Sequence, residues 1–380
     1  MLKPLLEQYD IELVCHLVSG PQGDNAPEPE LLLALSRQDA FLIASEYGVK
    51  FPNHPQPLAE KSVDLAKAVL SNLSNTDRLN TIAEVSAALW NDDTDSLAVL
   101  AKSFGQSSAA DSETAIAIGN QRRDKLKHYS GGMFYYEGEW YWGIDRLHYL
   151  EKRLTSLGVN KTNKPLLVPR PAIASGPNQD NGSLTLEIFP SLRSPYTAVI
   201  FDNAVKLAQD SGVNLVVRPV LPMVMRGVPA TREKGMYIFS DCVREADMQG
   251  VAYGNFYDPI GDPVRRAYSL FPWACEQGKG TEFISAFLRC AFSEGINTSN
   301  DNGLRKVVEK AGLDWQQAKP LVGQPGWEEL LEENRQVMYK AGLWGVPSFR
   351  LLDKDGQQQL AIWGQDRLWL VAREIQRLLS

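Results

Sequence analysis

The stretch Trp344-Gly345-Val346-Pro347-Ser348-Phe349 decides the fold, together with Ile362-Trp363-Gly364-Gln365-Asp366-Arg367-Leu368, to which it leads. The first part predicts a buried strand that is entered through an X-Pro bond. A polar turn at Asp353-Lys354-Asp355-Gly356 separates it from a second strand, and apolar residues at helical spacing predict a closing helix over 366–379. The chain therefore ends in a strand–turn–strand–helix unit.

A similar unit occurs earlier in the chain. It starts at Ser130-Gly131-Gly132-Met133-Phe134 and turns at Glu137-Gly138. It continues through Trp142-Gly143-Ile144-Asp145-Arg146-Leu147 into a helix that ends near Leu157. The two stretches predict that the chain contains two copies of one fold.

Length and charge limit the class of protein. A chain of 380 residues is too long for one compact core and suits two domains. The net charge of −7 provides no basic field, so nucleic acid is not expected as a partner. No apolar run is long enough to span a bilayer, and Met1-Leu2-Lys3-Pro4 lacks the apolar core of a signal peptide. We expect a cytoplasmic protein without membrane contact.

Cysteine and histidine spacing gives no sign of a metal site. The four cysteines never approach C-x-x-C spacing, so buried free thiols are expected rather than a redox dithiol or a zinc site: Cys15, Cys242, Cys275 and Cys290. The four histidines occur singly and all lie in the first half, so solvated or buried structural histidines are expected: His16, His54, His128 and His148.

The first half is predicted to be a domain over residues 1–157. An alternating pattern predicts a strand over 11–17, and apolar residues at helical spacing predict an inserted group of helices over 30–104 and another helix over 112–128. Residues 158–182 are rich in Pro, Gly and Asn, and are predicted to be a linker.

The second half is predicted to be a complete domain over residues 183–380. It opens with an alternating strand over 184–189 and a helix that has Ser194 at its N-cap and Pro195 in its first turn. Another strand follows over 213–218, and a helical insertion is predicted over about 233–341. With the closing unit, this order describes an α/β sheet with an inserted all-helical subdomain.

The first copy lacks a counterpart of the opening strand. When Ile11-Glu12-Leu13-Val14 is aligned with Val213-Asn214-Leu215-Val216, nothing in the first half matches the strand and helix start around Ser194. Either the natural chain starts earlier, or another segment fills the gap, for which Pro165-Leu166-Leu167-Val168 is a candidate.

Four short motifs resemble the DsbA-like superfamily, and within it the kappa-class glutathione transferases and the 2-hydroxychromene-2-carboxylate isomerases: Ser194-Pro195-Tyr196, Lys234-Gly235-Met236-Tyr237, Gly345-Val346-Pro347 and Gly364-Gln365-Asp366-Arg367. The resemblance covers residues 184–379, and more faintly 5–157. It implies two thioredoxin-like domains, each with an inserted helical subdomain, of which the first is degenerate. Redox members carry C-x-x-C at the position of Ser194, so its absence favours the glutathione branch.

The resemblance implies a catalytic role for Ser194. A hydroxyl at a helix N-terminus would stabilise the thiolate of bound glutathione and so raise the reactive fraction of the thiol at neutral pH. The alternative is that Ser194 only caps its helix.

The resemblance also implies a set of glutathione-binding residues. Val346-Pro347 resembles the cis-proline site whose backbone pairs with the peptide, and Lys234 matches a lysine that pairs with a glutathione carboxylate. Gln365 and Asp366 match the site of the γ-glutamyl end, where Asp366 can also act as a helix N-cap. The remaining candidates lie beside Ser194: Arg193 and Tyr196. A solvated Lys234 and a salt-bridging Arg193 remain open alternatives.

Two observations argue against intact glutathione sites, the first in the second copy and the second in the first copy. Kappa-class enzymes carry an asparagine in the loop before the lysine, whereas Met223-Val224-Met225-Arg226-Gly227-Val228 has none. In the first copy, Gly131-Gly132 replaces Val346-Pro347, and only Asp145 remains of the glutathione set.

The leading hypothesis is therefore a glutathione-dependent isomerase or transferase. The alternatives are a non-catalytic thioredoxin-like binding protein and, third, a thiol-disulfide oxidoreductase. The two copies are expected to pack as a pseudo-dimer within one chain.

Overall fold

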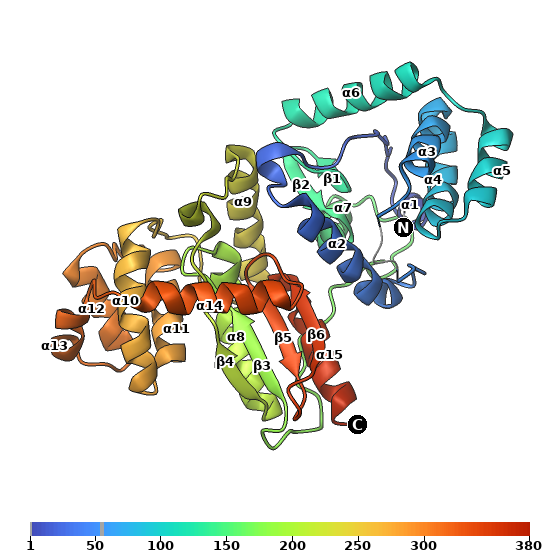
Figure 1. Ribbon diagram of the computed structural model, residues 1–380. Coiled ribbons are helices and arrows are strands. Elements are labelled where there is room, and N and C mark those ends of the chain that lie inside the picture. Colours follow the sequence, from blue (N-terminus) through green and yellow to red (C-terminus); the bar gives the residue numbers. More distant parts are fainter. Residues whose placement is uncertain (1, 54–56) are drawn as a thin grey trace. The chain divides into compact units, whose positions relative to one another are not determined.

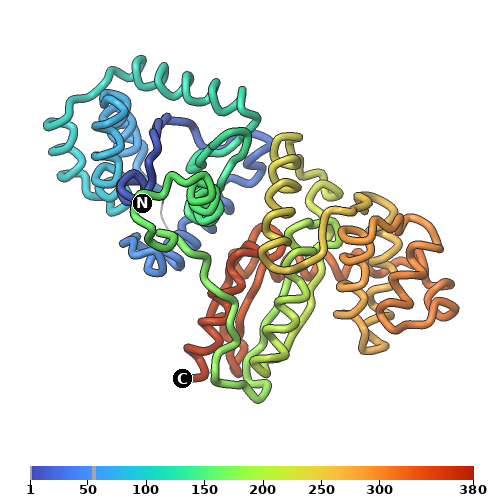
Figure 2. Tube along the Cα trace, turned by 180° about the vertical axis from the view of Figure 1, so that it is seen from behind, coloured from blue at the N-terminus to red at the C-terminus, as the bar shows by residue number. Residues whose placement is uncertain are grey.

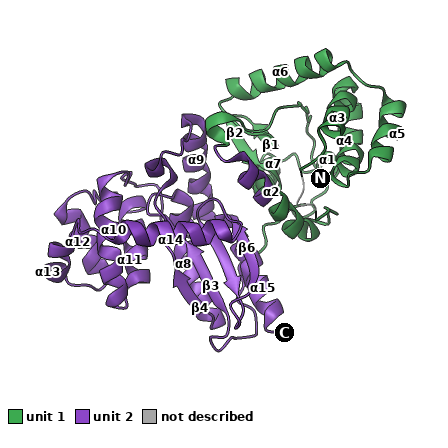
Figure 3. Cartoon of the chain, in the orientation of Figure 1, with its two compact units in different colours: residues 1–26, 36–171 green, residues 27–35, 172–380 purple. Residues whose placement is uncertain are grey.

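The computed structural model describes residues 2–53 and 57–380, so that His54 lies outside the described part. The chain forms two compact units (Figure 3). The first comprises Met1–Ala26 and Ser36–Pro171, and the second comprises Pro27–Leu35 and Ala172–Ser380. The main division falls inside the connector predicted over 158–182. The second unit also includes nine residues from far upstream in the sequence.

A four-stranded sheet organises the second unit (Figure 1). The strand order is β4-β3-β5-β6, with β3 parallel to β4 and the other pairs antiparallel. The strands are β3 (Thr185–Phe189), β4 (Asn214–Val217), β5 (Ser348–Leu352) and β6 (Gln358–Trp363). Strand β3 lies inside the sheet and is buried from Leu186 to Phe189, as its apolar sequence predicts.

Helices cover both faces of this sheet. Helices α8 (Pro195–Ser211) and α15 (Leu368–Leu378) contact each other and the strands on one face. Side chains of successive strand residues point to opposite faces. Phe189 packs with Met338 of α14 (Trp327–Lys340), so α14 covers the other face.

The predicted insertion is helical throughout its regular elements. Figures 1 and 2 show α10–α13 gathered at one side of the sheet. The helices before α14 are α9 (Arg232–Gln249), α10 (Asp262–Glu276), α11 (Gly280–Phe292), α12 (Asp301–Lys310) and α13 (Trp315–Ala318). Short 3-10 helices complete this unit: η3 (Met223–Arg226), η4 (Lys319–Leu321) and η5 (Gln365–Arg367). The unit therefore has the thioredoxin-like strand–helix–strand, insertion and strand–strand–helix order that the sequence predicts.

A buried carboxylate ties three strands of this sheet together. Glu187 of β3 is only 2% exposed. Its oxygens accept hydrogen bonds from Arg218 Nε, just after β4, at 2.6 Å and from Arg350 Nη1 of β5 at 3.1 Å. A buried charge is tolerated when it is paired and hydrogen-bonded in this way.

The first unit is mostly helical. Its helices are α1 (Leu2–Gln8), α2 (Pro29–Ala44), α3 (Glu60–Asn72), α4 (Asn75–Trp90), α5 (Thr94–Phe104), α6 (Ala109–Lys125) and α7 (Gly143–Ser156), with 3-10 turns η1 (Gly23–Asn25) and η2 (Ser45–Tyr47). The first residues of α2 belong to the second unit. Helices α3, α4 and α5 share a core around Val69, Val85 and Leu97. A hairpin of β1 (Met133–Tyr136) and β2 (Glu139–Trp142) precedes α7.

The strand predicted over 11–17 is wrong. This segment has no regular structure, because side chains rather than a neighbouring strand satisfy its backbone. The Asn75 side chain accepts from Cys15 N at 2.8 Å and donates to Leu13 O at 2.9 Å, and Arg78 Nη1 donates to Cys15 O at 2.7 Å. The alternating pattern is thus that of an extended segment held by α4.

The candidate strand 165–168 is also wrong. Its backbone is bound to a buried carboxylate: Glu151 accepts from Leu167 N at 2.7 Å and from Val168 N at 3.0 Å. Tyr9 OH donates to the same carboxylate at 3.1 Å. Among its described residues, the first unit therefore has a two-stranded sheet and lacks the four-stranded sheet that a second thioredoxin-like domain requires.

We expect Glu187→Gln to destabilise the protein by about 2–4 kcal/mol, because it leaves two arginines without their shared counter-charge. Chemical denaturation in urea measures this change in the free energy of unfolding. Glu309→Gln is the control, because its pairing with Arg305 is exposed, and it should cost less than about 1 kcal/mol. Equal losses of unfolding free energy in the two variants would contradict the stabilising role of the buried Glu187 charge.

Buried His128 should make the protein sensitive to acid. Burial lowers its pKa from 6.5 to about 4. The unfolded chain binds the proton at higher pH than the folded chain, so stability is lost as the pH falls from 6.5 to 4, by up to about 3 kcal/mol. Unfolding measured across this window should show a shallower pH slope for His128→Asn than for the wild type. Identical slopes would refute this prediction.

Candidate functional site

Strand pairing brings the predicted site segments to one edge of the sheet. Phe189, the last residue of β3, lies opposite Ser348, the first residue of β5, and Ser348 lies opposite Trp363, the last residue of β6. The segments that follow β3, precede β5 and follow β6 therefore meet at this edge. A hydrogen bond of 3.0 Å from Gly364 N to Pro347 O joins two of them.

Ser194 is the N-cap of α8. Its Oγ accepts a hydrogen bond from Thr197 N at 3.1 Å, and its side chain is half-buried. A hydroxyl can accept and donate at the same time, so this cap leaves the Ser194 O–H able to donate. Both readings of the sequence, helix cap and anion-binding hydroxyl, are therefore compatible in one geometry.

Tyr268 of α10 fixes the loop before Ser194. Its buried hydroxyl accepts from Leu192 N at 3.1 Å and donates to Val220 O at 3.1 Å. Burial raises the pKa of Tyr268, so the phenol stays protonated and keeps donating. The sequence around Tyr268 gives no sign of this role, because its partners lie 76 and 48 residues away in the chain.

Arg193 and Tyr196 contact the helical insertion. Both guanidinium nitrogens Nε and Nη2 of Arg193 lie 2.8 Å from the carboxylate oxygens of Asp258, in the bidentate geometry typical of arginine. Tyr196 OH donates at 2.7 Å to buried Asp241, which also accepts from Arg244. These two predicted residues therefore hold the start of α8 against the insertion.

The Val346–Pro347 peptide bond is cis, as predicted. Gly345, just before it, has no room for a side chain, because a Cβ would lie 2.5 Å from Trp363 Nε1. Trp344 packs edge-on to the same ring, with 5.6 Å between the ring centroids. The glycine thus allows the loop to lie directly against Trp363.

Lys234 reaches the same loop from α9. Its Nζ lies 5.7 Å from the centroid of the Trp344 ring, within the range of a cation–π contact. Burial lowers the pKa of Lys234, which indicates that its ammonium group is poorly solvated. The structure therefore brings Lys234 to the residues beside Val346 and Pro347.

Gln365 and Asp366 occupy η5, directly after β6. Gln365 is buried, and its side-chain amide donates to the carboxylate of Glu245 on α9. Asp366 Oδ1 lies 3.5 Å from Arg367 Nη1. The expected role of Asp366 as a cap is wrong, because α15 begins at Leu368 with Arg367 at its N-cap.

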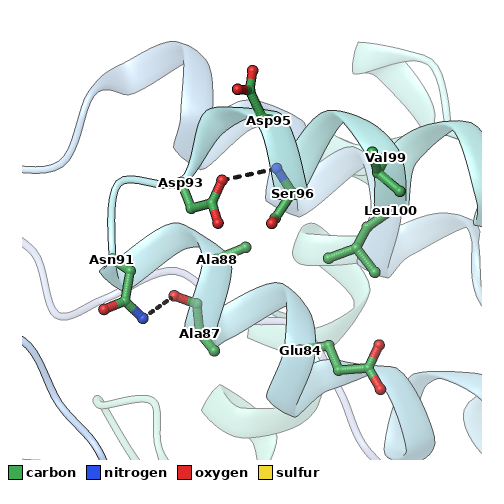
Figure 4. Close-up of a pocket in the computed structure, with 9 residues that line it drawn as sticks. All are labelled: Glu84, Ala87, Ala88, Asn91, Asp93, Asp95, Ser96, Val99 and Leu100. Carbon is green, nitrogen blue, oxygen red and sulfur yellow. Dashed lines mark hydrogen bonds between the residues drawn. The ribbon is translucent and has the colours of Figure 1, made fainter.

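A separate pocket lies in the first unit between α4 and α5 (Figure 4). None of the predicted site residues lines it; the lining residues are Glu84, Ala87, Ala88, Asn91, Asp93, Asp95, Ser96, Val99 and Leu100.

Within residues 2–53 and 57–380, no group of three or more His, Cys, Asp or Glu could hold a metal ion. No helix of this described part is long and apolar enough to cross a membrane.

The sheet order and the inserted helices define a thioredoxin-like domain, in which the predicted site segments meet at one edge of the sheet. A family model described as the DSBA-like thioredoxin domain matches residues 185–376, which is half of the chain. The chain therefore belongs to the DsbA-like thioredoxin family.

Solved structures with similar folds include three proteins of known or probable class. A 2-hydroxychromene-2-carboxylate isomerase is 21% identical, with a TM-score of 0.43 over 51% of this chain and 95% of that chain. A probable DsbA oxidoreductase from Streptomyces coelicolor is 18% identical, with a TM-score of 0.40 over 52% and 92%. The cytosolic disulfide reductase DsbM from Pseudomonas aeruginosa is 18% identical, with a TM-score of 0.38 over 52% and 100%. No curated protein matches the chain.

The anchoring role of Tyr268 can be tested with Tyr268→Phe. This change leaves the buried Leu192 N–H without its acceptor, so we expect a loss of about 1–3 kcal/mol in the free energy of unfolding. Hydrogen exchange of the Leu192 amide should accelerate more than exchange elsewhere in the sheet. Tyr257→Phe, at a partly exposed ring, is the matched control. Unchanged exchange at Leu192 would show that Tyr268 does not anchor the loop.

Proposed function

We propose that the second unit is a glutathione-dependent isomerase or transferase, similar in its chemistry to 2-hydroxychromene-2-carboxylate isomerases and kappa-class glutathione transferases. One observation carries this proposal. A serine, rather than a cysteine, caps α8 at the sheet edge that also carries the cis Val346–Pro347 bond.

The proposed chemistry starts from the thiol of glutathione. The N–H groups at the start of α8 and the Ser194 hydroxyl would stabilise the thiolate and lower the pKa of the bound thiol. The thiolate then adds to an activated double bond of a small-molecule substrate. If it leaves again after rotation about the resulting single bond, the product is an isomer; if it stays and the carbanion takes up a proton, the product is a conjugate.

The remaining predicted residues would bind glutathione or position the residues that do. The backbone of Val346 would pair with the peptide, and the ammonium group of Lys234 would bind a glutathione carboxylate. Asp366 would accept from the γ-glutamyl ammonium group, while Gln365 would orient that segment through Glu245. Arg193 and Tyr196 would act by fixing the start of α8.

The chain's own thiols support the glutathione reading over disulfide exchange. Desolvation raises the pKa of Cys15 and of Cys275, although Cys275 is exposed rather than buried as expected, and it raises the pKa of Cys290 to about 11. These thiols stay protonated at neutral pH and are poor nucleophiles. Cys242 is fully buried. A thiol-disulfide oxidoreductase is therefore the third candidate.

A non-catalytic thioredoxin-like binding protein is the second candidate. Three of the predicted residues already hold internal partners: Arg193, Tyr196 and Gln365. The loop over 223–228 also lacks the asparagine of kappa-class enzymes. Both observations are typical of a site that has lost its ligand.

We further propose that the first unit descends from a degenerate copy of the second. In its support, β1, β2 and α7 follow one another as β5, β6 and α15 do. The sequence Gly-x-Asp-Arg-Leu occurs at Gly143 and again at Gly364. A pseudo-dimer of the two units and a cytoplasmic location remain predictions.

Titration calorimetry with glutathione at pH 7 tests the proposal. We expect saturable binding to the wild type, weakened ~10-fold in Asp366→Ala through loss of a charge-assisted hydrogen bond. The absorbance of the bound thiolate should show a lowered thiol pKa in the wild type but not in Ser194→Ala. Ser156→Ala, at an exposed position of α7, is the control.

Two outcomes would reject the enzyme. Absence of binding at millimolar glutathione would favour the non-catalytic protein. Reduction of a model disulfide without added glutathione would favour the oxidoreductase.

A further inference from the structure

A glutamate from far upstream lies against the loop that carries the cis peptide bond. Glu28 belongs to Pro27–Leu35, the nine upstream residues of the second unit (Figure 3). Its Oε2 accepts from Trp344 Nε1 at 2.6 Å and from Tyr339 OH at 3.0 Å. Two donors from different elements therefore converge on one carboxylate oxygen.

Cations lie over both donor rings. Lys234 Nζ is 5.7 Å from the centroid of the Trp344 ring, and Arg335 Cζ is 4.7 Å from the centroid of the Tyr339 ring. Each cation adds positive potential and draws electron density from the ring, which makes its N–H or O–H a better donor. Arg335 also donates to both carboxylate oxygens of Glu332, at 2.7 and 2.5 Å, which offsets part of its charge. The preference for a negatively charged acceptor therefore rests mainly on the two donors.

Apolar contacts hold the rest of the segment beside the same loop. Leu32 N donates to Glu28 O, so Glu28, Leu32 and Leu35 lie on one face of a helical turn. Leu35 is buried in a cluster with Phe189 and Trp344, and Leu32 packs against that cluster together with Val346. By contrast, Leu31 and Leu33 are exposed.

The contacts made by Glu28 are those that any carboxylate would make. An indole N–H and a phenol O–H that converge on one oxygen recognise the carboxylate group, not the residue that carries it. We propose that Trp344 and Tyr339 form a carboxylate-binding site beside the cis-proline loop, which Glu28 fills as an internal ligand, so that an external carboxylate competes with Glu28 for it.

Tethering determines how strongly Glu28 competes. A group on the same chain acts at an effective concentration in the millimolar range or above, so a free carboxylate should bind weakly to the wild type. Removal of the Glu28 side chain leaves the donors and the cations in place. The vacated site should then bind a small carboxylate that fits the space of the missing group.

The test uses the full-length protein and acetate as the probe. Indole N–H resonances of the nine tryptophans are recorded by NMR, and Trp344→Phe identifies the resonance of Trp344. Acetate should shift this resonance saturably in Glu28→Ala, with an apparent Kd at least ~10-fold lower than in the wild type. Glu30→Ala, an exposed carboxylate two residues away, should behave as the wild type. Leu32→Ala weakens the packing of the segment but keeps the Glu28 carboxylate, and Leu33→Ala, at an exposed position, is its control. Comparing these variants with Glu28→Ala separates loss of packing from loss of the carboxylate.

Two results would overturn the inference: no saturable shift in Glu28→Ala, or the same Kd for acetate in Glu28→Ala and the wild type. If Glu28→Ala does not fold, Glu28→Gln replaces it. That amide is a weaker competitor than the carboxylate, so acetate should still bind more tightly than to the wild type, and equal affinity would again refute the site.

Only the identity of a natural ligand rests on the proposed function. Glutathione carries two carboxylates, so its affinity should also rise in Glu28→Ala. If acetate binds but glutathione binds to neither protein, the proposed function fails and the carboxylate site stands. If glutathione binds but acetate does not, the carboxylate site fails and the proposed function stands.

Discussion

The sheet of the second unit depends on satisfying one buried charge. Glu187 lies in an inner strand, where a lone carboxylate would cost several kcal/mol. Its two arginines come from opposite sides, Arg218 after β4 and Arg350 on β5, so the charge is satisfied only when both neighbouring strands keep their register. That register places Phe189 opposite Ser348. The position of Ser194 relative to Pro347 therefore follows from an ion cluster with no direct part in the proposed chemistry.

The sequence predicts this unit well because its signals are local. Alternation within 184–189, a capping serine before a proline and a glycine–valine–proline strand entry each determine a few neighbouring residues. The four strands and the helical insertion follow from such signals, whereas the cis bond is implied by the resemblance of Val346-Pro347 to the cis-proline site of the DsbA-like superfamily. The contacts that these elements make across the fold do not follow from local signals. Neither Tyr268 nor Glu245 carries a local pattern that points to the loop it holds.

The first unit shows where local reasoning fails. Residues 11–17 alternate as a strand does, but a strand exists only when another strand pairs with it. Here Asn75 and Arg78 bind the backbone instead, and at 165–168 Glu151 does the same. Such side-chain contacts between distant residues leave no periodic signal. Likewise, nothing in residues 27–35 indicates that they pack with residues more than 150 positions away.

The internal contacts of the site divide its residues into two groups. Arg193, Tyr196 and Gln365 use their polar groups to hold α8 and η5 against the insertion, and a ligand could recruit them only by breaking these bonds. Ser194 differs, because its cap uses an acceptor and not its donor. A ligand at this edge would therefore meet a rigid frame in which the hydroxyl of Ser194 can donate a new hydrogen bond. Such a preorganised frame limits the entropy lost on binding, so the internal contacts that suggest a decayed site are equally those that a functional one requires.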